Sequence, residues 1–422
     1  MRALGAVFLA VGLAASATAQ VEVVRAVDRC VLPVTDQRAP WTAARTARPA
    51  APDCDPATEG AVFEVTYQDF PPAAEAAFQA AVDTWACRIR SDQPVRVAAS
   101  WETLAPSTLG SAGPFLYRNF AGAPTRDVWY PAALADALAG RDLGDGQPDI
   151  EAFFNSDFRD WHFGPGPPPR DRYDLYTVVL HELGHGLGLI GALTVDGGVG
   201  RVGESPEGPY TYDLHAQTPL GTSLLNTDAF PDGSAALADA LQAEVRFAGR
   251  AVDRVNGRSV PLYAPPRWVQ GGSYSHLDEE AYPASTPDGL MTPFIARGEF
   301  VEAPGKVVCA MTADVGWPLA GACAEAVGVL PPANPVVTVE RRGPNPFASR
   351  TVVRISGEEP VSVRVALLDV LGRRVVDYGT SILVAGQTRD LAVEGARLAS
   401  GVYFLSIRGG PEPVVVPLTV AR

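Results

Sequence analysis

The chain contains very little lysine. Lys306 is the one lysine among 34 basic residues, which stand against 48 acidic ones and leave a net charge of −14 over 422 residues. Such an acidic chain repels nucleic acid and anionic lipid. Charged residues make up 19% of the chain and apolar residues 47%, which is too little charge for a chain that stays disordered. The composition therefore excludes wholesale disorder and argues against a nucleic-acid partner.

The chain also lacks an apolar run long enough to span a bilayer. The N-terminal run from Ala3 to Ala15 is shorter than the ~20 residues that a spanning helix needs. Arg2 precedes this run and Ala17-Thr18-Ala19 follows it, a pattern typical of a secretory signal peptide over residues 1–19. A membrane anchor is the alternative interpretation. We therefore expect an exported protein whose mature chain has no transmembrane segment and whose cysteines can form structural disulfides.

Cysteine is scarce and odd in number, so one cysteine must remain without a partner in the chain. The sequence cannot select among the pairings, but nearness along the chain favours Cys30 with Cys54 and Cys309 with Cys323. This pairing leaves Cys87. If a helix over 72–90 carries Cys87, its side chain lies about 180° from the apolar stripe of that helix. A free reactive thiol and a partly buried inert one are then both possible.

The length predicts more than one domain. Residues 20–60 are rich in Ala, Arg and Pro, as in an N-terminal extension tied down by a disulfide or in a removable pro-segment. From residue 61 to 324 the patterns predict a mixed α+β domain that begins with a strand–helix–strand crossover unit. A Pro-containing linker follows at 325–340, and residues 341–422 alternate as the strands of a small sandwich. The helices are expected at 72–90, 174–189 and 234–245, and the strands at 61–70, 94–101, 149–156, 351–355, 361–369, 374–378, 387–393, 401–408 and 414–420.

The strongest chemical signal is the run His181-Glu182-Leu183-Gly184-His185. Residues four apart lie on one face of a helix, so the two imidazoles can bind one metal ion while Glu182 sits beside it. Zinc suits nitrogen ligands and keeps one position for water. The ion would lower the pKa of that water towards ~7, and Glu182 could take its proton during attack on a carbonyl. The motif therefore predicts a zinc-dependent hydrolase of amide bonds.

A catalytic zinc site normally takes three ligands from the protein, and this motif supplies two. The remaining histidines are His162, His215 and His276. His162 is expected to be a pocket or surface residue. His215 and His276 both remain candidates for the third ligand, and the Cys87 thiolate is an alternative ligand in a latent form.

From His181 the sequence matches the HExxHxxG pattern of the metzincins, in which the glycine, here Gly188, lets the chain turn sharply. Gly191 stands where the short form of that motif has its third ligand, and it has no side chain. The segment Ser275-His276-Leu277-Asp278 precedes Leu290-Met291-Thr292-Pro293. With these motifs the chain resembles the leishmanolysin-like branch of the metzincins, in which the third histidine follows an insertion and precedes a methionine turn.

This resemblance extends from about Ala61 to Ala324. It implies a metzincin-like zinc peptidase domain with a mixed twisted sheet, a backing helix and an active-site helix. It also implies that the strand Ile150 to Phe154 lies at the sheet edge and pairs with a protein or peptide substrate. The implied site residues are the zinc ligands His181, His185 and His276, the general base Glu182, the helix-ending Gly188 and the turn residue Met291.

The C-terminal segment carries three ordered motifs, Gly343-Pro344-Asn345-Pro346-Phe347, Leu368 to Arg373 and Leu398 to Phe404. Together they resemble the C-terminal sorting domains of type IX secretion substrates, which have an immunoglobulin-like sandwich. The resemblance implies export across the outer membrane of a Gram-negative bacterium by that secretion machinery, to the medium or the cell surface. The alternative is an ordinary sandwich that binds carbohydrate or packs on the catalytic domain.

We therefore expect a secreted zinc endopeptidase, with a surface binding or adhesion protein that carries a structural or inactive metal site as the alternative. A calcium ion is a further candidate cofactor, since Asp142, Asp145 and Asp149 lie close together in the sequence. Their spacing is not that of a known calcium loop, so a solvated turn is the alternative.

Overall fold

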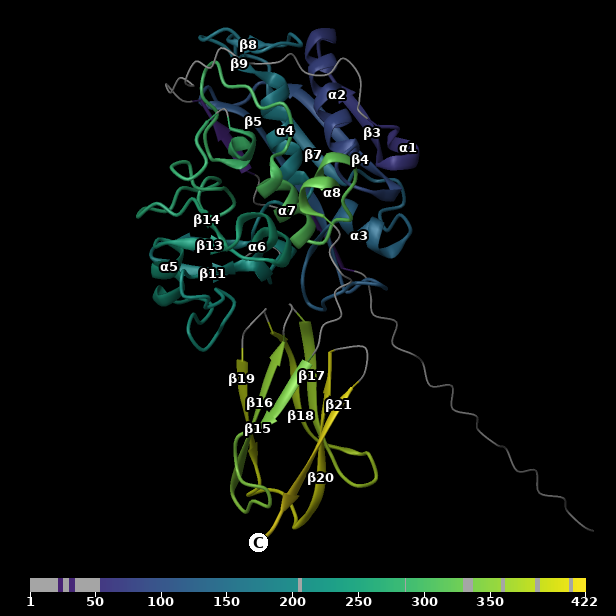
Figure 1. Cartoon of the computed structure of the whole chain (residues 1–422), viewed down its shortest axis with the longest axis vertical. Coiled ribbons are helices and arrows are strands. Elements are labelled where there is room, and N and C mark those ends of the chain that lie inside the picture. Colours follow the sequence, from purple (N-terminus) through teal and green to yellow (C-terminus); the bar gives the residue numbers. More distant parts are fainter. Residues whose placement is uncertain are drawn as a thin grey trace, which may run out of the picture.

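The computed structural model describes residues 22–25, 30–34, 54–203, 207–284, 286–328, 337–357, 361–383, 388–409 and 413–422. The expected signal peptide lies outside these residues, as do much of the 20–60 segment and the middle of the expected linker. The described residues form a mixed α+β protein with more strands than helices. Figure 1 shows the helices and the largest sheet in the purple-to-green part of the chain, and β-structure in the yellow-green C-terminal part.

The first unit of the larger part is the predicted crossover. Strand β3 (Ala61–Gln68) leads into α2 (Pro72–Ala86), and β4 (Ser91–Glu102) returns parallel to β3. Helix α2 buries Phe78, Val82 and Trp85, the apolar stripe that its sequence predicts. It ends at Ala86, before the expected Arg90, so the helical angle assumed for Cys87 does not apply.

The main sheet has the order β1-β5-β7-β4-β3. Strand β7 (Ile150–Asn155) pairs parallel with β4 on one side and antiparallel with β5 (Thr108–Arg118) on the other. The expectation that the strand Ile150 to Phe154 lies at the sheet edge is therefore wrong. The expectation failed because the Gly- and Pro-containing sequence of β5 does not show the strand pattern.

The outer edge of β5 pairs with the N-terminal segment. Strands β1 (Glu22–Arg25) and β2 (Cys30–Pro33) both run antiparallel to β5. In β2, Cys30 lies opposite Ala112 and Leu32 opposite Gly110. The Leu32 side chain is fully buried in the main core. Strands β1 and β2 thus occupy the edge to which another extended chain could otherwise add.

Helix α4 (Leu175–Gly186) crosses next to α2 in Figure 1 and is buried along its whole length. The indole N–H of Trp85 donates to the carbonyl of Leu180, which joins the two helices at 2.9 Å. Asp174 caps the helix by accepting from the Thr177 amide at 3.0 Å. The helix thus begins directly after Asp174, close to the start that the sequence predicts.

The other elements of this part are short, and half of them lie in the segment between α4 and residue 276. They are α1 (Pro56–Glu59), β6 (Tyr130–Pro131), α3 (Ala132–Ala139), β8 (Trp161–His162), β9 (Tyr173–Asp174), β10 (Leu193–Asp196), β11 (Val199–Val202), η1 (Thr211–His215), β12 (Ala216–Gln217), α5 (Ala235–Leu241), β13 (Val245–Phe247), α6 (Arg250–Asn256), β14 (Val260–Leu262), η2 (Pro287–Met291), α7 (Lys306–Asp314) and α8 (Gly321–Val327).

The C-terminal residues form two antiparallel sheets that share a second core. One sheet holds β15 (Val337–Arg341), β16 (Arg350–Gly357) and β19 (Thr388–Glu394). The other has the order β18-β17-β20-β21, with bounds Arg374–Leu383, Val361–Leu368, Gly401–Arg408 and Val414–Val420. Strand β15 begins inside the segment that the sequence analysis assigns to the linker.

Two disulfides join Cys54 to Cys87 and Cys309 to Cys323. The predicted bond between Cys309 and Cys323 is confirmed, whereas the predicted bond between Cys30 and Cys54 is wrong. Cys87 is fully buried and bonded, so the expectations of a free thiol or a latent thiolate ligand there are wrong too. Nearness in sequence misled the assignment because the turn after α2 brings Cys87 next to the segment just before α1. Cys30 is left as the odd cysteine.

Among the described residues, no helix has the length and apolar character needed to span a membrane.

Candidate metal centre

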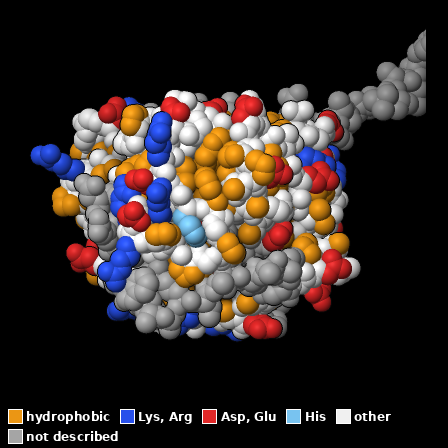
Figure 2. Space-filling view, turned by 90° about the horizontal axis from the view of Figure 1, so that it is seen from above, with side chains coloured by type: hydrophobic (Ala, Val, Ile, Leu, Met, Phe, Trp, Pro, Cys, Tyr) orange, Lys and Arg blue, Asp and Glu red, His pale blue; other side chains and the backbone are white. Residues whose placement is uncertain are grey.

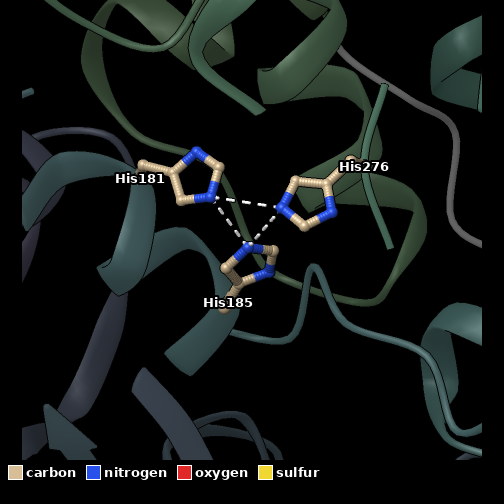
Figure 3. Close-up of side chains that lie close together, drawn as sticks. All are labelled: His181, His185 and His276. Atoms are coloured by element: carbon tan, nitrogen blue, oxygen red, sulfur yellow. Dashed lines mark hydrogen bonds between the residues drawn. The ribbon is translucent and has the colours of Figure 1, made fainter. Parts of the chain in front are cut away.

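Three histidines from two distant segments meet at one point. His181 and His185 project from the same face of α4, and His276 comes from the chain after β14 (Figure 3). Their Nε2 atoms lie 3.0 Å (His181 to His185), 3.2 Å (His185 to His276) and 3.3 Å (His181 to His276) apart. In the part of the chain that the structure describes, this is the one cluster of candidate ligands close enough to share a metal ion.

The other ring nitrogen of each histidine contacts a backbone carbonyl. The Nδ1 atoms of His181, His185 and His276 lie 2.6, 2.7 and 2.7 Å from the carbonyl oxygens of Leu290, Leu189 and Gly272. A carbonyl only accepts hydrogen bonds, so Nδ1 must carry the proton in each ring. In the neutral imidazole Nε2 is then an acceptor, which leaves three lone pairs that face one another without a proton between them.

The electrostatics of this cluster favour a bound cation. All three rings are at most 1% exposed, and burial lowers the pKa of His181 to about 4 and that of His276 to about 3. Burial, together with the two neighbouring rings, lowers the pKa of His185 well below its ordinary value. The imidazoles are therefore neutral near pH 7, as metal ligands must be. Three nitrogen donors suit zinc, copper, iron or nickel, and the residues fit such an ion.

Glu182 lies beside these ligands in the sequence and is equally buried. Its side chain is inaccessible to solvent, and neither carboxylate oxygen has a hydrogen-bond partner among the described residues. Burial raises its pKa well above the ordinary value. The nearby backbone amide of Ala112 in β5 partly opposes that shift, although its geometry is not that of a hydrogen bond. A buried carboxyl without a partner is costly. A cation held by the histidines would favour its ionised form.

Gly184 and Gly188 let other chain segments approach α4 closely. A side chain at Gly184 would meet the Met291 sulfur at 2.8 Å, so Met291 lies directly against the helix turn that carries His181 and His185. Gly188 has φ of +110°, and a Cβ there would meet the ring of Pro131 at 2.6 Å. The sharp turn expected at Gly188 is present, just after α4 ends.

The other candidates from the sequence lie elsewhere. The Nδ1 atom of His162 lies 3.2 Å from Oδ1 of Asp174. His215 contacts the carbonyl oxygen of Ala248 at 2.9 Å through Nδ1, and its ring stacks on Phe247. Neither belongs to the histidine cluster. Of the two candidates for the third ligand, His215 and His276, the structure thus places His276 next to His181 and His185.

The aspartates considered for calcium are engaged within the protein. Asp142 accepts from the amides of Gly144 and Gly146 and pairs with Arg96 at 2.6 Å. Asp149 accepts from the amide of Arg96 at 2.8 Å. Among the residues that the structure describes, Asp142, Asp145 and Asp149 do not form a group able to share an ion. The arrangement is that of a turn held by its own backbone.

Several residues that position the site carry no sequence signal. The carbonyls of Leu189, Gly272 and Leu290 orient the imidazoles, and any residue type supplies a carbonyl. Asp213 and Tyr274 lie next to Gly191 and are fully buried. Their burial could not be deduced from the irregular, glycine-rich pattern of the 191–275 insertion.

The centre is closed in this structure. The three histidines and Glu182 are each at most 1% exposed. Strand β2 pairs with the part of β5 that includes Ala112, whose amide faces Glu182, and it also contacts α4. Figure 2 shows little histidine on the face that it draws, where hydrophobic side chains gather beside charged ones. A large substrate cannot reach these side chains unless a covering segment moves.

No known protein family matches the chain, and no curated protein matches it either. Among solved structures, the chain is similar to the CARDB domain of a Pyrococcus furiosus protein in complex with di-metal ions, at 16% identity and a TM-score of 0.17 over 22% of this chain and 95% of that one. A β-glucosidase from Erythrobacter marinus matches at 14% identity and a TM-score of 0.15 over 20% of this chain and 15% of that one. Likenesses this weak carry no argument about fold or function.

Proposed function

We propose that the protein is a secreted zinc-dependent endopeptidase that resembles the leishmanolysin-like branch of the metzincins. The observations that carry this proposal are the convergence of three neutral imidazole nitrogens and the buried carboxyl group of Glu182, which follows His181 in the same helix and has no hydrogen bond. A purely structural metal site would not require such a carboxyl group in its ligand helix. For this reason we prefer a peptidase to the adhesion protein with an inactive site.

In this proposal His181, His185 and His276 would hold the zinc ion. The ion would polarise the scissile carbonyl and acidify a water molecule, as zinc does in hydrolases. Glu182 would take the proton from the attacking water and pass it to the amine that leaves. The backbone carbonyls behind the three rings would keep each Nδ1 protonated and each ring in one orientation. Met291 would support the turn of α4 from below.

The substrate would pair with a strand other than the one first expected. Because β7 is paired on both sides, an extended peptide cannot add to it. Without β1 and β2, β5 would be the edge of the sheet, and its residue Ala112 lies near Glu182. Peptides commonly add to such edges. We propose β5 as the substrate-binding strand once β1 and β2 leave it, which would make residues 20–33 part of a removable pro-segment.

The test measures zinc content and peptide hydrolysis on the same preparations of mature protein. Wild type should hold about one zinc and lose activity to a chelator. Glu182→Gln keeps the side-chain volume and all three ligands, so it should keep the zinc and lose about 10²- to 10⁴-fold in kcat. Activity that survives metal removal, or a Glu182→Gln variant that turns over peptide at the wild-type rate, would refute the proposal.

For the C-terminal sandwich we propose the sorting function that its three motifs imply. The support is a core of its own, formed by the two sheets, on which a secretion machinery could act without unfolding the catalytic domain. A reporter protein fused to residues 325–422 should reach the medium or cell surface of a bacterium with type IX secretion. It should stay in the periplasm of the same bacterium without that system. Identical distribution in the two strains would refute this function.

A further inference from the structure

The space beside Gly191 is filled by two buried side chains. A Cβ at Gly191 would overlap the ring of Tyr274 and lie 2.5 Å from Oδ1 of Asp213. The amide of Gly191 also donates to the hydroxyl of Ser275 at 3.1 Å. The start of the 191–275 insertion therefore lies against its end, next to His276, and no side chain can be accommodated at position 191.

Asp213 connects three parts of the insertion. Its carboxylate accepts hydrogen bonds from the amide of Tyr210 at 2.6 Å, from the amide of Ala192 at 3.0 Å and from the hydroxyl of Tyr274 at 2.5 Å. It is fully buried in η1. This carboxylate thus holds the chain after α4, the chain before η1 and the segment that leads to His276 in one arrangement.

Tyr274 has an unusual backbone conformation. Its φ is +74°, in the left-handed region that residues other than glycine rarely adopt. The conformation is held from several sides, since its amide donates to the Tyr263 carbonyl at 2.7 Å and its own carbonyl accepts from the Tyr212 hydroxyl at 3.0 Å. The side-chain hydroxyl is tied to Asp213. Strain of this kind persists only where the surroundings enforce it, and it is common at functional sites.

The enforced conformation sets the turn that presents His276. The Nδ1 atom of His276 contacts the carbonyl oxygen of Gly272 at 2.7 Å, so the imidazole is oriented by a group four residues earlier. Tyr274 lies between these two residues. A change in its φ would move the Gly272 carbonyl relative to the ring, and Nε2 would no longer point at those of His181 and His185.

We infer that Asp213 and Tyr274 are a positioning pair for His276, an inference that rests on the proposed function. They act on the metal through the backbone of residues 272–276 and do not touch it. The pair gives the insertion a role. Where the short form of the motif has its third ligand, this chain has Gly191, and the insertion must instead place the distant His276 with equal accuracy. Mutation of a residue that orients a metal ligand without binding the metal typically lowers metal affinity by about 10- to 100-fold.

The test compares zinc affinity with the stability of the metal-free protein. Tyr274→Phe removes only the hydroxyl, and Asp213→Asn removes the charge while it keeps the shape. Tyr403→Phe is the matched control, because it removes a hydroxyl that donates to the Ala399 carbonyl in the C-terminal sandwich. Zinc dissociation constants are measured by chelator competition on the full mature chain, and Tm is measured in chelator.

We expect Tyr274→Phe to weaken zinc binding about 10- to 100-fold, with a Tm in chelator close to that of Tyr403→Phe. The absorption spectrum of the cobalt-substituted variant should also shift, because one nitrogen ligand is displaced. Tyr274→Phe combined with Asp213→Asn should cost no more affinity than the larger single change, since both changes act on the hydrogen bond between these two side chains.

Two results would overturn the inference while the proposed function stands. One is a folded Tyr274→Phe variant with wild-type zinc affinity and cobalt spectrum. The other is a loss of zinc affinity in both single variants that is fully explained by the lower Tm of the metal-free proteins. A purely structural role would give that result. A wild-type protein that binds no zinc would instead refute the proposed function, and the positioning role with it.

Discussion

The Nε2 atoms of His181 and His276 lie 3.3 Å apart although 95 residues separate the two histidines in the chain. Each ring has its Nδ1 atom against a carbonyl oxygen, that of Leu290 for His181 and that of Gly272 for His276. The close approach is therefore one of two hydrogen-bond acceptors, which a cation bound to both nitrogens would stabilise.

The first prediction concerns the distant histidine. His276→Ala should lower zinc affinity by more than about 100-fold, since loss of a ligand exceeds the effect of its outer contacts. His215→Ala is the control, because this histidine lies in the insertion and outside the cluster. Metal analysis of both purified variants gives the answer. Equal zinc content in wild type and His276→Ala would remove His276 from the ligand set.

The second prediction concerns the strands that cover β5. Leu32 is fully buried in β2, so Leu32→Asp should weaken the attachment of this strand to the sheet. Turnover of an unfolded protein substrate should then rise, and deletion of residues 20–33 should raise it further. A short peptide that needs less of the β5 edge should respond less. Lower activity in a folded Leu32→Asp variant would show that the segment is a permanent part of the domain.

The third prediction concerns the disulfide between Cys54 and Cys87, which lie 33 residues apart in sequence. Loss of a crosslink that closes a loop of this length should lower the free energy of unfolding by about 3–4 kcal/mol on the chain-entropy account. Urea unfolding of Cys54→Ser, followed by circular dichroism, measures this change. A non-reduced peptide map of wild type should join the peptides of Cys54 and Cys87, and a Cys30–Cys54 linkage would contradict the structure.

The fourth prediction concerns two buried aspartates away from the metal centre. Burial raises the pKa of Asp149 to about 7 and that of Asp136 to about 6, from ordinary values of 3.8. The folded chain therefore keeps protons that the unfolded chain has already released. The contribution of the two aspartates to the free energy of unfolding is fully present below about pH 4. It is lost as the pH rises through their pKa values in the folded protein.

Replacing these aspartates by asparagine should flatten the dependence of stability on pH. In wild type each group should contribute a slope of up to about 1.4 kcal/mol per pH unit within its window. Unfolding of Asp149→Asn and Asp136→Asn is compared with that of wild type from pH 4 to pH 7, with the exposed Asp92→Asn as the control. Parallel curves for wild type and Asp149→Asn would contradict the shifted pKa.

Much of the local structure could be predicted from the sequence. The crossover from β3 through α2 to β4, the helix that begins after Asp174 and the strands β16 to β21 of the C-terminal sandwich all follow from periodicity and turn residues. These features depend on contacts between near neighbours in the chain, whose spacing is visible in the sequence. The pair His181 and His185 belongs to the same class, because one helical turn separates them.

The sequence by itself determined the helix motif, the acidic composition and the small set of histidines from which a third ligand could come. Only the tertiary structure decided that His276 meets that motif, that β7 lies inside the sheet between β4 and β5, and that Cys54 pairs with Cys87. Each of these results depends on how segments far apart in the chain come together. That arrangement is set by the burial of whole surfaces, such as that of Tyr274 against Gly191, which no local pattern encodes.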